Sequence, residues 1–191
     1  MKALEEKIRK EGKIFSGNIV KVGSFLNHRL DVNFLMEMGE EIARLYEGTG
    51  INKIITVEAS GIAMAVCVAS KMNVPVVFGK KASAKNLSEN VYVAEVYSFT
   101  HKKANSIAIS KEFLTEEDRV LIVDDFLANG EAIRGLIDIA NQAKAKVVGC
   151  AIAIEKGFQG GGDKLRSEGI RVDSLAIIDS MTDTSIKFRE I

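Results

Sequence analysis

The sequence lacks an excess of charge of either sign. Its 191 residues contain 26 Lys and Arg and 26 Asp and Glu, so the formal net charge is zero. This balance gives no basis for the strongly basic surface that nucleic-acid-binding proteins present. We therefore expect no nucleic-acid partner, and any anionic ligand must be held by local groups.

The chain also lacks a long apolar run. Its longest uncharged stretch, around residues 59–70, stops at Lys71, far short of the roughly 20 apolar residues that a membrane-spanning helix needs. The N-terminus alternates charged and apolar residues and so lacks the apolar centre of a secretory signal. We expect no membrane-spanning segment and a cytoplasmic location.

Cysteine is scarce, with Cys67 in an apolar helical run and Cys150 in an apolar strand run. Neither has the neighbours that a metal site or a reactive thiol requires, so both are predicted to be small core residues. The remaining composition, 47% hydrophobic and 27% charged, is that of a globular protein. We interpret residues 1–191 as a single domain.

A strand–helix–strand order occurs twice along the chain. The strands are continuously apolar, which is typical of parallel strands covered by helices on both faces. The predicted class is therefore α/β with a mainly parallel sheet, and ligands are expected beyond the carboxyl ends of its strands. The elements are residues 53–57, 61–72 and 74–78 in the first unit and residues 119–124, 131–144 and 147–154 in the second.

The segments outside these units are less regular. The first twelve residues predict a short amphipathic helix attached outside the core, and Asp31 is placed to cap a second helix. Residues 79–90 are polar and predict a flexible loop, followed by a β-hairpin. Residues 171–178 and 185–188 predict short edge strands.

Two adjacent acids, Asp124 and Asp125, stand where an apolar strand meets a loop that leads into a helix. If the chain turns there, both carboxylates can accept hydrogen bonds from a cis-diol. Ala128, Asn129 and Gly130 then offer backbone N–H groups beside the positive end of a helix, which suits a phosphate. Together they would bind a sugar phosphate; the alternative is an ordinary strand-end turn before a helix. The stretch reads Val-Leu-Ile-Val-Asp-Asp-Phe-Leu-Ala-Asn-Gly-Glu-Ala over residues 120–132.

This stretch resembles the phosphoribosyl-diphosphate signature of the type I phosphoribosyltransferases. The resemblance implies their fold: a mainly parallel sheet flanked by helices, a flexible loop with a hairpin, and a small hood. It also implies that Asp124 and Asp125 are the catalytic pair that holds the ribose hydroxyls. The loop around the 5′-phosphate would comprise Ala128, Asn129, Gly130, Glu131 and Ala132, although the family usually has threonines where this chain has Asn129 and Ala132.

Residues 24–28, 97–100 and 154–159 extend the resemblance to the branch of the family that uses xanthine. The implied reaction belongs to purine salvage: xanthine and 5-phospho-α-D-ribose 1-diphosphate give xanthosine 5′-monophosphate and diphosphate. Mg²⁺ would accompany the diphosphate, with no dedicated protein ligands, and the protein would be a homodimer. The alternatives are an adenine or guanine/hypoxanthine phosphoribosyltransferase, or a non-catalytic regulator that binds phosphoribosyl diphosphate.

A second anion site is expected at the strand end formed by residues 58–61. By resemblance, Ala59, Ser60 and Gly61 contact the diphosphate, often through a cis peptide bond, for which we consider Ala59–Ser60. A plain turn of small residues is the alternative. Lys81, in the flexible loop at residues 79–90, would reach the leaving diphosphate as a mobile charge when that loop closes as a lid.

The purine is expected beside the last strand of the second unit, where Lys156 can donate a hydrogen bond to an exocyclic oxygen. Adenine presents an amino group at that position and would leave the lysine unpaired. The hood, assigned to residues 13–30 and 155–191, would by resemblance place Val20 against the ring and let Asn27 hydrogen-bond to the base. Alternatively, Lys156 only borders a surface loop.

Overall fold

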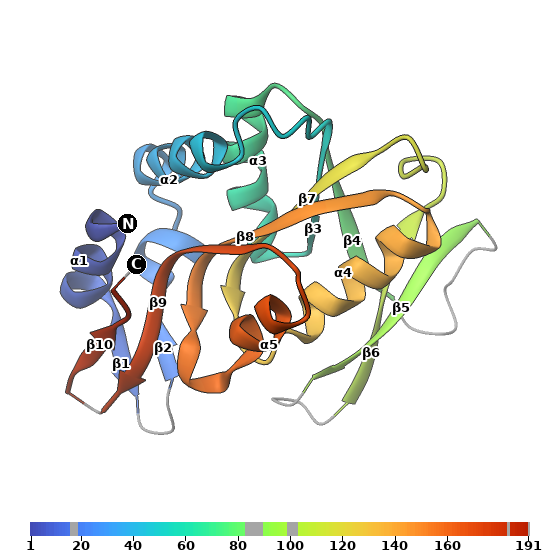
Figure 1. Cartoon of the computed structure of the whole chain (residues 1–191). Helices are drawn as coiled ribbons and strands as arrows, with labels where there is room; N and C mark the ends of the chain where they lie inside the picture. Colours follow the sequence, from blue (N-terminus) through green and yellow to red (C-terminus); the bar gives the residue numbers. More distant parts are fainter. Residues whose placement is uncertain (16–18, 83–89, 99–102, 183, 191) are drawn as a thin grey trace.

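The computed structural model describes residues 1–191 except 16–18, 83–89, 99–102, 183 and 191. Within these residues, the main sheet has eight strands in the order β10-β9-β8-β7-β3-β4-β6-β5 (Figure 1). Strands β4, β3, β7, β8 and β9 run parallel, whereas β10, β6 and β5 pair antiparallel with their neighbours. The fold is therefore α/β with a mainly parallel sheet, as predicted.

The bounds of the elements follow the two strand–helix–strand units closely. The strands are β1 (Lys13–Phe15), β2 (Ile19–Lys21), β3 (Lys53–Val57), β4 (Val76–Ala82), β5 (Val91–Ser98), β6 (Lys103–Ser110), β7 (Arg119–Leu127), β8 (Lys146–Lys156), β9 (Val172–Met181) and β10 (Ile186–Phe188). The helices are α1 (Lys2–Glu11), the π-helix η1 (Gly23–Asn27), α2 (Val32–Leu45), α3 (Ser60–Met72), α4 (Glu131–Gln142), the 3-10 helix η3 (Gly157–Gln159) and α5 (Gly161–Ser167).

The central strands are apolar at successive positions because helices cover both faces of the sheet. In Figure 1, α2 and α3 lie on one side of the sheet, and α4 and α5 lie on the other. Along β7, Leu121 and Val123 belong to the core beneath α2 and α3, and Val120 and Ile122 belong to the core beneath α4. A strand buried on both faces needs this continuous apolar run rather than an alternating one.

The N-terminal helix was expected outside the core, and the structure corrects this. Leu4 and Ile8 in α1 are fully buried and share a core with α2 and η1. The amino group of Met1 also donates a hydrogen bond to the carbonyl of Leu175 in β9. An isolated amphipathic stripe looks the same in a sequence whether or not a partner covers it, so the pattern alone did not reveal this packing.

Helix α2 begins where its capping residue predicts. The carboxylate of Asp31 accepts a hydrogen bond from the backbone N–H of Phe34 at 3.3 Å, which satisfies one of the free donors at a helix start. Lys7 of α1 donates to the other Asp31 oxygen at 2.8 Å. One aspartate thus caps α2 and attaches α1 to it.

Three segments differ from their predicted form. Residues 79–82, expected in a flexible loop, continue β4 because Lys80 and Lys81 pair with Ala108 and Ile107 of β6. Of the two tail segments expected as edge strands, β10 does lie at the edge of the sheet, whereas β9 pairs with β8 and with β10 and so lies inside it. Strands β9 and β10, which belong to the hood assigned at residues 155–191, therefore extend the main sheet.

The two cysteines are buried and free, as predicted for core residues. Burial, followed by the charge of Asp173, raises the pKa of the Cys150 thiol to about 12. Burial likewise raises the pKa of Cys67. Both thiols are therefore kept protonated and unreactive at neutral pH. Among the described helices, none is long and apolar enough to cross a membrane.

Candidate functional site

Asp124 and Asp125 lie near the carboxyl end of β7, and each is only 6% exposed. The strand continues to Leu127, so the chain does not turn at the acids as expected. The backbone N–H of Asp125 donates to Oδ1 of Asp124 at 2.9 Å. Burial, and then the neighbouring Asp125 charge, raise the pKa of Asp124 well above its ordinary value. A hydrogen-bond donor or a cation supplied by a ligand would therefore stabilise the charged form of this carboxyl group.

The start of α3 lies directly against these acids. A Cβ atom on Gly61 would lie 2.8 Å from Oδ1 of Asp124 and 2.4 Å from Oγ1 of Thr56 in β3. Glycine is required here because any side chain would displace both polar groups. Within the described residues, the buried Thr56 hydroxyl has no hydrogen-bond partner, so the site contains an unused polar atom beside the carboxylates.

The strand end at residues 58–61 contains a cis peptide bond, but it joins Glu58 to Ala59 rather than Ala59 to Ser60. Helix α3 begins at Ser60. The Glu58 carboxylate accepts a hydrogen bond from the backbone N–H of Lys81 at 2.7 Å. This bond fixes the residue 58–61 turn to β4, so Lys81 belongs to the same end of the sheet as the acids.

Lys81 is exposed, and it lies close enough to Asp124 for its charge to affect the pKa of that carboxyl group. Burial and Asp125 dominate the raised pKa of Asp124, and the Lys81 charge opposes them by a smaller amount. A lysine at this end of the sheet can supply positive charge to an anion that binds there. Its place on a paired strand differs from the predicted loop; Lys85, which was also expected in the loop, lies outside the described residues.

Ala128, Asn129 and Gly130 form the predicted loop between β7 and α4. Gly130 has φ +89°, a conformation that glycine adopts without strain, and the N–H of Arg134 donates to its carbonyl at 2.9 Å. Helical hydrogen bonding begins with that bond, so the N–H groups of Glu131 and Ala132 have no acceptor within α4. These free donors, at the positive end of the helix, suit a phosphate.

Lys156 ends β8 and is half-buried. Its Nζ lies 5.9 Å from the centre of the Phe126 ring on neighbouring β7, and burial lowers its pKa. The lysine is therefore partly withdrawn from water and lies near an aromatic ring, at the same carboxyl edge of the sheet as the acids. Its role as a donor to a bound base stays a prediction.

The two hood residues have different environments. Val20 in β2 is buried in the core that Phe126 and Phe158 also pack against, whereas Asn27 is exposed at the end of η1. Val20 is therefore part of the apolar core, and Asn27 is exposed to solvent. The residue 97–100 motif gives no further support, because residues 99 and 100 lie outside the described residues.

Sequence reasoning missed a buried ion pair beside Lys156. Glu155 is fully buried and accepts hydrogen bonds from Arg166 at 2.9 Å and 2.6 Å and from Ser174 at 2.5 Å. These three residues come from β8, α5 and β9, so no local spacing connects them. Thr56 was missed too, because a threonine in an apolar strand is an ordinary strand residue.

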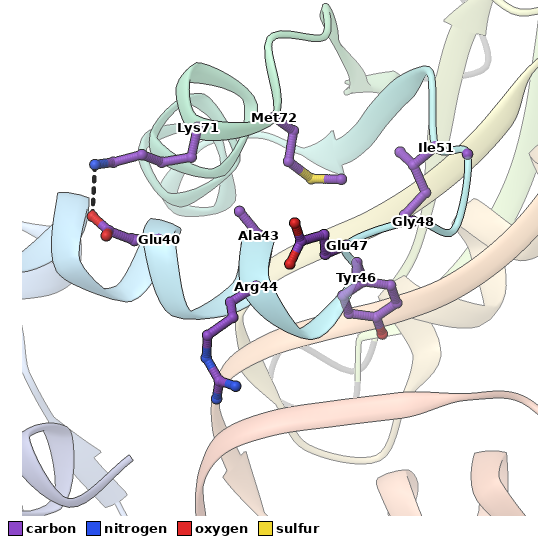
Figure 2. A pocket seen from close by; sticks show the side chains of 10 residues that line it. Glu40, Ala43, Arg44, Tyr46, Glu47, Gly48, Ile51, Lys71 and Met72 are labelled. Atoms are coloured by element: carbon purple, nitrogen blue, oxygen red, sulfur yellow. Dashed lines mark hydrogen bonds and ion pairs between the residues drawn. The ribbon is translucent and has the colours of Figure 1, made fainter.

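A cavity of about 520 Å³ lies at the opposite end of the sheet (Figure 2). The carboxyl-terminal halves of α2 and α3 line it, and Lys71 pairs with Glu40 across it at 2.7 Å. Ile51, which precedes β3, is part of its wall. Ligands of open parallel sheets bind beyond the carboxyl ends of the strands, so we place the functional site at the Asp124 end rather than here.

Comparison with known proteins agrees with this geometry. Residues 30–179 match the family described as phosphoribosyl transferase domain. The chain is 50% identical over 190 residues to a xanthine phosphoribosyltransferase of Oceanobacillus iheyensis, covering 100% of this chain and 98% of the relative. It is 51% identical over 191 residues to the protein of the same name from Lachnoclostridium phytofermentans, covering 99% of this chain and 98% of the relative.

Solved structures show the same fold at lower sequence identity. An adenine phosphoribosyltransferase from Thermoanaerobacter pseudethanolicus has a TM-score of 0.73 and 24% identity, covering 91% of this chain and 98% of its own. The Trypanosoma brucei adenine phosphoribosyltransferase, in complex with AMP, pyrophosphate and ribose-5-phosphate, has a TM-score of 0.74 and 17% identity, covering 88% and 77%. With the family match over most of its length, the chain belongs to the phosphoribosyl transferase domain family.

Proposed function

We propose that this protein transfers the phosphoribosyl group of 5-phospho-α-D-ribose 1-diphosphate to N9 of xanthine, forming xanthosine 5′-monophosphate and releasing diphosphate. One observation carries the proposal: the buried acids Asp124 and Asp125 are followed by a short loop and the start of α4, whose first N–H groups have no acceptor within the helix. The chain around them is 50% identical to a relative named xanthine phosphoribosyltransferase.

The sugar phosphate would bind across β7 and α4. Asp124 and Asp125 would accept hydrogen bonds from the two ribose hydroxyls, whose donors compensate the buried carboxylates. The 5′-phosphate would lie against the backbone N–H groups that begin α4, from Ala128, Asn129, Gly130, Glu131 and Ala132. The positive end of the helix and its backbone donors would hold the phosphate in place of the threonine hydroxyls that the family usually provides.

The diphosphate would lie between β3 and β4. Ala59, Ser60 and Gly61 present backbone close to the acids, and exposed Lys81 adds a positive charge. As the C1′–diphosphate bond breaks, C1′ gains oxocarbenium character and N9 of the base attacks the opposite face, which inverts the anomer. Groups fixed before the reaction lower its barrier by orienting the two substrates and stabilising the leaving negative charge.

Lys156 would select the base. Its ammonium group donates hydrogen bonds and accepts none, so it pairs with an exocyclic oxygen at C6 and not with the amino group of adenine. The partial burial that lowers its pKa also increases the cost of leaving it unpaired. Val20 would pack on the purine ring and Asn27 would hydrogen-bond to it from the hood.

The residues also fit Mg²⁺ bound together with the diphosphate. Among the described residues, no group of three or more His, Cys, Asp or Glu side chains could form a protein cage. Mg²⁺ prefers one or two carboxylates with waters and substrate phosphates, and the partnerless Thr56 hydroxyl beside Asp124 is a further oxygen donor. Asp124 and Glu58 would hold the ion through water, and the ion would neutralise charge on the leaving diphosphate.

The wider organisation is proposed on the family relationship. Residues 1–191 would form a single domain that assembles into a homodimer, with no nucleic-acid or membrane partner. Sedimentation equilibrium of the purified protein measures the assembly directly. A monomer at all concentrations would contradict the homodimer.

The proposal is tested by diphosphate release from phosphoribosyl diphosphate and Mg²⁺ with xanthine, guanine, hypoxanthine or adenine, beside a control without base. Xanthine should be the preferred base, and the double variant Asp124→Asn with Asp125→Asn should lose turnover while remaining folded. Preference for adenine would refute the Lys156 assignment. Binding of phosphoribosyl diphosphate without turnover would favour a regulator, and full activity of the double variant would refute the sugar site.

A further inference from the structure

Helix α5 lies between the two halves of the proposed site. Three consecutive glycines form its start: Gly160 is the N-cap, and Gly161 and Gly162 are its first two residues. In Figure 1, α5 lies beside α4 and near the carboxyl end of β8. The phosphate loop of residues 128–130 precedes α4, and Lys156 ends β8, so α5 is placed to contact both.

Gly161 packs directly on the phosphate loop. A Cβ atom at this position would lie 2.2 Å from the carbonyl oxygen of Ala128, 2.5 Å from the carbonyl carbon of Asn129 and 2.8 Å from the nitrogen of Gly130. All three are backbone atoms, so no side-chain rotation could relieve the overlap. The backbone of α5 at Gly161 therefore limits how far the phosphate loop can extend toward α5.

Gly162 packs on the other half of the site, through Glu155. A Cβ atom on Gly162 would lie 2.2 Å from Oε1 of Glu155 and 2.5 Å from its carboxyl carbon. That carboxylate cannot move freely, because it is fully buried and held by Arg166 at 2.9 Å and 2.6 Å. Lys156 is the next residue of the chain, so the backbone position of the lysine depends on the Glu155 pair.

Two further contacts hold α5 against α4. Arg134 of α4 forms a double hydrogen bond with Glu168, just after α5, at 2.8 Å and 2.9 Å. Leu165 of α5 is fully buried, and its Cδ1 lies 3.6 Å from a Cβ position on Gly130. The phosphate loop, α4, α5 and the end of β8 are thus joined by continuous packing and paired charges.

We propose that α5 is a positioning element that fixes the phosphate loop and Lys156 relative to each other, with Gly161 positioning the loop and Gly162 positioning the base-binding end of β8. The inference rests on the proposed function, because it assigns the loop to phosphoribosyl diphosphate and Lys156 to the purine. It adds that two adjacent glycines control the binding of two different substrates.

Substitution by alanine separates the two roles. In Gly161→Ala the loop must move by about 1 Å to admit the methyl group, and a misplacement of that size costs on the order of 10²-fold in activity. The dissociation constant and KM for phosphoribosyl diphosphate should rise about tenfold or more. In Gly162→Ala the methyl group displaces Glu155, so KM for xanthine should rise and the xanthine-to-adenine ratio of kcat/KM should change.

The experiment compares the full-length protein with both variants and with Gly39→Ala. A Cβ atom on Gly39 would lie 2.8 Å from the backbone of Cys67 in α3, so this control introduces a similar overlap away from the loop and β8. It should lower Tm without changing the ratio of the two KM values. The readouts are both KM values, the base ratio, and calorimetric binding of phosphoribosyl diphosphate with Mg²⁺.

The proposal is supported if Gly161→Ala raises mainly the KM for phosphoribosyl diphosphate and Gly162→Ala raises mainly the KM for xanthine. Equal changes of both KM values in each variant, or no change, would overturn it. Arg166→Lys keeps the charge but loses the double hydrogen bond to Glu155, so it should reproduce the Gly162→Ala pattern even if that variant does not fold. An unchanged xanthine KM in folded Arg166→Lys also overturns it. Failure of the unmodified protein to turn over xanthine would instead refute the proposed function.

Discussion

Replacing Asp124 with asparagine should make the protein more stable at neutral pH while abolishing its activity. Asp124 is 6% exposed, and its one protein donor is the adjacent backbone N–H of Asp125 at 2.9 Å among the described residues. An asparagine keeps an oxygen for that donor and removes the charge that is buried beside a second carboxylate. It also removes an acceptor for the ribose hydroxyls, so binding of phosphoribosyl diphosphate should fall.

The stability difference should depend on pH in a defined direction. Burial, and then the charge of Asp125, raise the pKa of Asp124 in the folded state above its unfolded value of about 3.9. The folded chain therefore holds this proton more tightly than the unfolded chain does. The resulting stabilisation is complete below the unfolded pKa and is lost as the pH rises through the raised folded pKa. Asparagine does not titrate, so the advantage of Asp124→Asn should appear only as pH rises.

The expected gain follows from the cost of an uncompensated buried polar group. Each unit of pKa shift corresponds to about 1.4 kcal/mol, and a buried group without its partner typically costs about 1–3 kcal/mol. We expect a gain in that range in the free energy of unfolding at pH 8. For a chain of this length, Tm should rise by about 2–4 °C per kcal/mol.

Urea unfolding of both proteins between pH 4 and about 8 measures the effect without ligand. Asp118→Asn is a matched control, since Asp118 is 7% exposed but paired with Lys53 at 2.7 Å and with the N–H of Thr115 at 2.8 Å. That control should be destabilised at pH 8. If Asp124→Asn is less stable than the unmodified protein at pH 8, or if their difference does not change with pH, the reasoning is wrong.

Three other changes give separate tests. Lys156→Met removes the proposed donor to the base, so KM for xanthine should rise far more than the dissociation constant for phosphoribosyl diphosphate; equal changes in steady-state kinetics and calorimetry would remove Lys156 from the base site. Leu136→Ala removes a fully buried side chain of α4 and should cost about 2–5 kcal/mol in urea unfolding; a loss below about 1 kcal/mol would contradict the packing. Arg166→Met leaves the Glu155 carboxylate buried without its cation and should cost about 3–5 kcal/mol, whereas a stability equal to that of the unmodified protein would show that the pair contributes nothing.

Much of the fold could be predicted because its signals are local. The apolar runs of β3, β7 and β8 and the periodic face of α4 appear at nearly the predicted bounds. The packing of α1 and the interior position of β9 could not be predicted, because both depend on which distant segment covers an apolar surface. The extension of β4 to residue 82 depends on its pairing with β6, which is also a long-range contact.

The candidate site also has one part that local sequence predicts and another part that depends on long-range contacts. Asp124, Asp125 and the residues that follow them are consecutive, so a single stretch of sequence contains a pair of acids, a phosphate loop and a helix start. The structure changed their detail, since the strand continues past the acids and the cis bond joins Glu58 to Ala59. The site roles, those of Asp124 and Asp125 as well as those of Val20, Asn27 and Lys81, stay predictions that the substrate experiments test.

The sequence by itself determined the parallel α/β architecture and predicted the end of the sheet at which ligands are proposed to bind, because strand hydrophobicity, helix capping and loop chemistry are encoded within a few neighbouring residues. The tertiary structure alone decided that Thr56 and Gly61 meet Asp124, and that Glu155, Arg166 and Ser174 form one buried network. These contacts join residues that lie far apart in the chain. Their energies depend on burial and on distances of a few ångströms, which only the packed fold sets.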